Sequence, residues 1–102
     1  MFNGITHFVE VPENTHSSMA EQVAQILTQA ELTLAAVGSD KSCLLSATIY
    51  ITDRSNVSAL NAAWEAWLPK GCAPSRACVK VELLDPKMLV EIAFVAAVPQ
   101  TL

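Results

Sequence analysis

The sequence predicts an α+β fold in which two helices pack on one face of a mixed β-sheet. Short β-type segments and two amphipathic helical segments follow one another in the order strand, helix, strand, helix, strand, strand. Crossovers between parallel strands keep one hand, so both helices should cover the same sheet face. The last segment, residues 88–98, is apolar on both sides, which indicates that the other sheet face is buried as well.

The first two elements are a strand and a long helix. Residues 5–11 alternate loosely between apolar and polar side chains and stop at a proline, as strands do. Ser18 and Glu21 have the spacing of a capping box, so we expect a helix over residues 19–37 that Gly38 terminates. The apolar stripe of this helix consists of Val23, Ile26, Leu27, Ala30, Leu34 and Val37.

A second strand and a second helix follow. Residues 44–52 are rich in β-formers and alternate between two faces, and Asp53 ends the segment. Either Ser55 or Asn56 can cap the next helix, which a proline and a glycine then break. The buried stripe of this helix consists of Val57, Leu60, Trp64, Trp67 and Leu68.

The last two strands are expected over residues 76–83 and 88–98, joined as an antiparallel hairpin by the turn sequence LDPK. Hairpin pairing would bring Arg76 close to Glu91, a carboxylate between apolar neighbours that needs compensation if it is buried. Two interpretations stay open. In the first, the two residues form a structural ion pair or an ion pair at a subunit interface. In the second, Arg76 binds a substrate carboxylate while Glu91 transfers a proton or positions a water.

Composition limits the classes of partner. The 102 residues fit one domain, residues 1–102, and 52% hydrophobic against 16% charged residues favours a closed homo-oligomer. The net charge of −4 and the scattered basic residues argue against nucleic acid and anionic membranes. No apolar run is long enough to span a bilayer and no signal peptide is recognisable, so we expect a cytoplasmic protein.

The cysteines and glycines argue against a disulfide framework, a zinc site and a phosphate-binding loop. Three cysteines without paired ligand spacing predict free thiols, and three scattered glycines cannot form a phosphate-binding loop. Cys78, close to Arg76, is either an activated nucleophile or, more commonly for such a residue, a small buried hydrophobe. Asn61 interrupts an apolar helical stretch and can bond locally.

Three segments resemble signatures of one known family. PSRACVKV at residues 74–81 resembles the signature P-A-R-S-C-V-x-V, and VEIAFVA at residues 90–96 is similar to V-E-I-E-x-x-A of the RidA/YjgF proteins, the reactive-intermediate deaminases. ATIYITDRSNVSALNAAWEAWL at residues 47–68 resembles that family's strand, Asp-terminated turn and Asn-containing helix. The resemblance covers roughly residues 10–98, and the spellings VPEN, AWEAW and DPK look closest to a YoaB-like branch.

The resemblance implies a chorismate-mutase-like fold and a homotrimer with ligand pockets at the subunit interfaces. Arg76 matches the arginine that binds the carboxylate of a 2-imino or 2-enamino acid, and Glu91 matches the glutamate that positions or activates water. Cys78 matches a cysteine lining the pocket, and Asn61 matches the family's helix asparagine. The implied reaction is hydrolysis of the imine to a 2-oxo acid and ammonia, with no metal or organic cofactor.

The sequence departs from the family pattern at its N-terminal end. The family's first strand is expected to be missing or shortened here, and Val9 and Glu10 stand where the family has small or neutral residues. Two alternatives to the deaminase are therefore carried forward. One is a catalytically inactive member that binds a small carboxylate or serves a structural role, and the other is a thiol-based role for Cys78.

Overall fold

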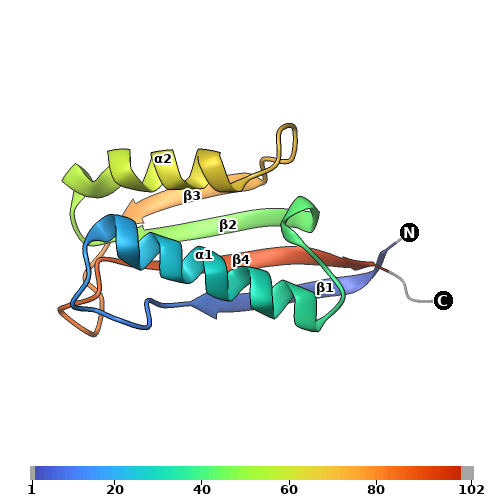
Figure 1. The fold of residues 1–102 in the computed structure, drawn as a ribbon, viewed down its shortest axis with the longest axis horizontal. Coiled ribbons are helices and arrows are strands. Elements are labelled where there is room, and N and C mark those ends of the chain that lie inside the picture. Colours follow the sequence, from blue (N-terminus) through green and yellow to red (C-terminus); the bar gives the residue numbers. More distant parts are fainter. Residues whose placement is uncertain (1, 100–102) are drawn as a thin grey trace.

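The computed structural model describes residues 2–99 and has the predicted order of elements (Figure 1). Two short 3₁₀ turns precede β2 and α2. The elements are β1 (Phe2–Glu10), α1 (Met19–Ala36), η1 (Lys41–Cys43), β2 (Leu44–Ile51), η2 (Arg54–Asn56), α2 (Val57–Trp67), β3 (Ser75–Lys80) and β4 (Val90–Pro99). Both helices lie on one face of the sheet, so the predicted fold class is confirmed.

The four-stranded sheet has the order β1-β4-β2-β3, and the predicted hairpin between the last two strands is wrong. Strand β3 pairs parallel to β2, while β4 pairs antiparallel with β2 on its other side and with β1. The most apolar strand, β4, takes a central position where both edges are paired. Strand β3, which carries Arg76 and Lys80, takes an edge, where charged side chains can reach water.

Helix α1 has the predicted caps. The hydroxyl of Ser18 accepts a hydrogen bond from the backbone N–H of Glu21 at 3.2 Å, and the Glu21 carboxylate accepts one from the backbone N–H of Ser18 at 3.3 Å. At the other end Gly38 has a φ of 75°, and its N–H and that of Ser39 bond to carbonyls of the last helical turn. This is the Schellman arrangement, which favours glycine because the residue is left-handed.

The start of α2 differs from the prediction. Asn56 occupies the N-cap position without a side-chain hydrogen bond, and the bond lies one turn earlier, where Asp53 accepts from the backbone N–H of Ser55 at 2.9 Å. The turn η2 thus takes up the chain reversal between β2 and α2. Hydrogen bonds from Ser55 hold the pKa of Asp53 below its ordinary value of 3.8, and the bond from the serine backbone contributes more than the bond from its side chain.

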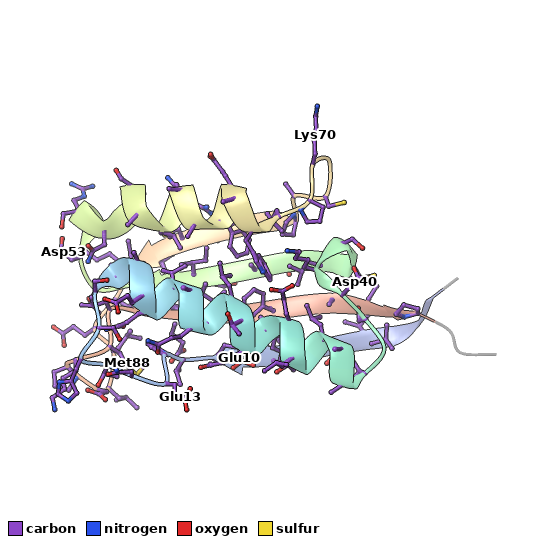
Figure 2. The ribbon with its side chains drawn as sticks, viewed as in Figure 1. Glu10, Glu13, Asp40, Asp53, Lys70 and Met88 are labelled. Atoms are coloured by element: carbon purple, nitrogen blue, oxygen red, sulfur yellow. The ribbon has the colours of Figure 1, made fainter. Side chains whose placement is uncertain are left out.

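The core lies between the helices and the sheet. Phe94 of β4 is fully buried and its ring stacks on Phe8 of β1 with centroids 5.1 Å apart and on Trp64 of α2 at 6.3 Å. Strand β1 is also tied to α1 by Glu10, whose carboxylate accepts from Gln29 at 3.1 Å and from Thr33 at 2.8 Å (Figure 2). Glu10 therefore faces α1, away from the open side of the sheet.

Within residues 2–99 no helix covers the opposite face of the sheet, and we call it the bare face. Its exposed apolar side chains include Ile5, Val9 and Val79, which are 69%, 49% and 42% accessible. Cα partners across neighbouring strands share a face, so the strand register defines the rest of the surface. The bare face consists of Ile5, His7, Val9, Ser46, Thr48, Tyr50, Ser75, Ala77, Val79, Glu91, Ala93, Val95 and Ala97.

Candidate functional site

Arg76 is held at the edge of the sheet, on the face that α2 covers. Its Cα partner on β2 is Ala47, a buried residue beneath the helices, so the arginine points towards α2. There its Nη2 donates a hydrogen bond of 2.6 Å to the Oδ1 of Asn61. The sequence interval between the two residues spans the whole α2–β3 connection, so tertiary structure alone brings them together.

Trp64 supplies a second support for the same arginine. The guanidinium carbon lies 6.0 Å from the centroid of the indole ring, at the outer limit of a cation–π contact. Trp64 lies one helical turn after Asn61 and is only 4% exposed, so the ring forms a fixed platform. The sequence predicted only a packing role for Trp64, and its three-residue spacing from Asn61 was the available signal for this further contact.

The charge of Arg76 is uncompensated within the described part of the chain. Its hydrogen-bond acceptor is a neutral carboxamide, and among the described side chains the one ion pair joins Lys41 to Glu31. A guanidinium carries a positive charge and five N–H donors in a planar fork. An exposed guanidinium with a neutral partner can therefore receive an anionic group, most favourably a carboxylate that binds two of its N–H groups.

Glu91 lies on the bare face and is not close to Arg76 within one chain. Its Cα partner is Tyr50, whose side chain points away from the helices, whereas Arg76 shares its face with Ala47. Strand β2 also separates the two residues. The predicted meeting of Arg76 and Glu91 depended on the hairpin and fails with it, because period-two alternation sends the two side chains to opposite faces.

Cys78 is half-buried on the same strand as Arg76 and packs against the core. It lines a surface depression of about 410 Å³ together with the basic residues Arg54 and Lys80. The small-hydrophobe interpretation therefore fits its packing, although its position in this depression leaves the thiol within reach of a small molecule. Asn61 and Arg76 do not line this depression.

A larger hollow of about 580 Å³ lies beside the C-terminal half of α1. It is lined by Thr28, Glu31, Leu32, Ala35, Ser39, Asp40, Lys41 and Pro69. None of the four candidate residues belongs to it, and Lys41, its one basic lining residue, already pairs with Glu31 at 3.7 Å. The uncompensated arginine is therefore a better marker of the site than the size of this hollow.

Gln22 joins the loop before α1 to the loop before β4, a role that was not predicted from the sequence. It is fully buried, and its carboxamide nitrogen donates to the carbonyls of Thr15, Ser17 and Lys87 at 3.4, 3.2 and 3.2 Å. Its oxygen accepts from the N–H of Leu89 at 2.9 Å, two residues before Glu91. The available signal was a glutamine on the apolar stripe of α1, where a polar residue needs buried partners.

Residues 2–99 contain neither a candidate metal cluster nor a candidate membrane-spanning helix. No group of three or more His, Cys, Asp or Glu side chains in that part of the chain is arranged to hold a metal ion. Within the same part, neither helix combines the length and the apolar character that crossing a bilayer requires.

Comparison with known proteins identifies the class to which this fold and site belong. Residues 10–98 match the family model described as Endoribonuclease L-PSP, and the chain belongs to this family, which is also known as RidA/YjgF or RutC. The chain is 43% identical over 96 residues to the RutC family protein YoaB of Escherichia coli strain K12, covering 94% of this chain and 84% of that protein. The predicted family and its YoaB-like branch are thus confirmed.

Solved structures agree with this assignment. A member of the YjgF protein family from Neisseria meningitidis is 39% identical with a TM-score of 0.91, and the match covers 97% of this chain and 83% of that chain. The protein YyfA of the conserved Rid family from Yersinia pestis, described as being of unknown function, is 30% identical with a TM-score of 0.86, over 96% and 83% of the two chains.

Proposed function

We propose that this protein hydrolyses 2-imino and 2-enamino acids to 2-oxo acids and ammonia, in pockets between the subunits of a homotrimer. The observation that carries the proposal is the exposed guanidinium of Arg76, held by Asn61 and Trp64 and left without a countercharge among the described side chains. This arrangement suits a small substrate with a carboxylate. The family resemblance supplies the reaction class.

The chemistry asks little of the protein beyond orientation. Water adds to the electrophilic imine carbon, Glu91 accepts a proton from the water, and the imine nitrogen takes up a proton. In the resulting carbinolamine the hydroxyl group gives up its proton as the carbonyl forms, the amino nitrogen takes the proton from Glu91, and the carbon–nitrogen bond breaks. Ammonia leaves, the 2-oxo acid is the second product, and Glu91 is again a carboxylate. An enamino acid first takes a proton at its β-carbon to become the imine. Holding the substrate near a placed water is the main catalytic contribution.

A second copy of the chain has to complete this site. Arg76 and Glu91 lie on opposite sheet faces of one chain, so a pocket containing both takes Glu91 from a neighbouring subunit. The apolar bare face, with Glu91 as its carboxylate, is the surface that such a neighbour would cover. A closed ring of three copies repeats the same contact and forms three equivalent pockets.

The proposal is tested by intersubunit complementation. The purified protein accelerates loss of a 2-imino acid made in situ by an amino-acid oxidase and detected by semicarbazide trapping, whereas Arg76→Ala and Glu91→Ala are inactive. In trimers mixed at random from equal amounts of the two variants, each pocket has about one chance in two of each intact residue, so about a quarter of native activity returns. Mixed trimers without activity would exclude a pocket shared between copies.

A catalytically inactive, carboxylate-binding family member is the second candidate. It is favoured by the fact that a single chain assembles the arginine half of the site without Glu91. Binding of 2-oxobutyrate that depends on Arg76, with no acceleration for any imine, would establish this candidate. Unchanged activity of Cys78→Ala would dispose of the thiol-based role.

An RNA substrate, which the family description suggests, is not proposed. The chain has a net charge of −4 and only six basic residues against ten acidic ones. Binding of RNA depends on neutralising phosphates with clustered Lys and Arg side chains. We likewise propose no membrane partner and no metal or organic cofactor for this reaction.

A further inference from the structure

We infer that Asn61 is a positioning residue for Arg76: its carboxamide occupies one side of the guanidinium and leaves a single two-point face for the substrate carboxylate. The inference rests on the proposed function and makes it more specific. Sequence resemblance placed Asn61 among the substrate-binding residues. The structure instead shows its oxygen bonded to the arginine, at 2.6 Å from Nη2.

The geometry of a guanidinium gives this bond its consequence. The group offers two pairs of parallel N–H bonds to a carboxylate, one from Nε and Nη2 and the other from Nη1 and Nη2. Nη2 belongs to both pairs and carries two hydrogens. When Asn61 takes one of them, it removes one pair and leaves the other intact. The ligand carboxylate is thereby restricted to one orientation relative to the edge of the sheet.

The neutral charge of Asn61 is as important as its position. An aspartate there would bind the same nitrogen but would cancel the positive charge that attracts the substrate. The asparagine restrains the arginine and preserves its charge. Trp64 complements this restraint because its buried ring, 6.0 Å from the guanidinium carbon, limits movement of the planar group out of its plane.

Two variants separate the restraint from the charge. The chain has only two arginines, Arg54 and Arg76, so the rotation of each guanidinium about its Nε–Cζ bond can be followed by ¹⁵N NMR. In the native protein Arg76 should rotate more slowly than the exposed Arg54, which serves as an internal reference. Asn61→Ala should make Arg76 rotate as fast as Arg54, whereas Asn61→Asp should keep it slow.

Binding of 2-oxobutyrate, measured by titration calorimetry, is the second measurement. Asn61→Ala should raise its Kd about tenfold, as expected when a hydrogen bond that orients a charged group is lost. Asn61→Asp should raise the Kd at least as much while the rotation stays slow. Glu65→Ala, at an exposed position of the same helix, should change neither quantity and is the matched control.

The outcomes distinguish the two proposals. Slow rotation of Arg76 in Asn61→Ala, or an unchanged Kd in that variant, would overturn the positioning role. If the native protein and all variants fail to bind 2-oxobutyrate, yet Asn61→Ala still frees the guanidinium, the restraint stands and the proposed recognition of 2-oxo acids falls. Circular dichroism of each variant verifies that α2 is intact, and alanine favours the helix at this position.

Discussion

Replacing Gln22 with leucine should destabilise the protein although it makes the core more apolar. The substitution keeps the volume and the helical preference of the residue but removes both polar ends of its side chain. The two N–H bonds of the native carboxamide serve three carbonyls, and its oxygen accepts one further bond, from Leu89. The substitution removes two N–H donors and one acceptor, which is the equivalent of three full hydrogen bonds to the loops that precede α1 and β4.

The magnitude follows from this count. At roughly 0.5 to 1.5 kcal/mol for each hydrogen bond, Gln22→Leu should lower the free energy of unfolding by about 2 to 4 kcal/mol. For a chain of this size the corresponding fall in Tm is about 10 to 25 °C. Urea unfolding followed by circular dichroism measures the change, at one protein concentration because assembly shifts apparent stability.

The control and the local effect make this prediction specific. Gln25→Leu, on the adjacent side of α1, loses one exposed and one part-buried hydrogen bond and should cost less than about 1 kcal/mol. In Gln22→Leu the amide hydrogen of Leu89 should also exchange faster, because its acceptor is gone. A loss of stability no larger than that of Gln25→Leu, with unchanged hydrogen exchange at Leu89, would refute the role of Gln22 in holding the loops before α1 and β4 together.

Four further outcomes are expected. Ser18→Ala should cost about 1 kcal/mol in urea unfolding through loss of the capping box, and an unchanged midpoint would contradict it. Glu10→Ala should cost roughly 1 to 2 kcal/mol by releasing β1 from α1, and wild-type stability would show that these bonds contribute nothing. Val95→Asp puts a charge in the middle of the bare face and should reduce the mass measured by light scattering to that of a monomer; an unchanged oligomer would place the interface elsewhere. Hydrogen bonds from Ser42 hold the pKa of Asp40 below its ordinary value of 3.8, and the bond from the serine side chain contributes more than the bond from its backbone. The ionised Asp40 therefore stabilises the fold above pH 3.8, and this stabilisation is lost as the pH falls through the lowered pKa. Asp40→Asn should flatten that part of the unfolding profile, and an identical acid limb in the variant would contradict the linkage.

The local features of this protein could be predicted from the sequence because they depend on residues that are neighbours in the chain. The capping box of Ser18 needs a residue three positions away, and the stop at Gly38 needs a left-handed residue after a helical stripe. The order of strands and helices, and the face that each helix buries, follow from side-chain periodicity in the same way. The family and the fold class rested on these patterns and on short motifs, and both were confirmed.

The pairing of β4 and the geometry around Arg76 were decided only by the tertiary structure. A short turn predicted that β3 and β4 would pair, but a strand apolar on both faces is more stable in the middle of a sheet, so β4 lies between β1 and β2. In this strand order Arg76 and Glu91 lie on opposite faces of the sheet, and Arg76 contacts Asn61 and Trp64. Periodicity specifies the face that a side chain occupies, whereas its neighbour depends on competition among whole strands for burial, which no local pattern contains.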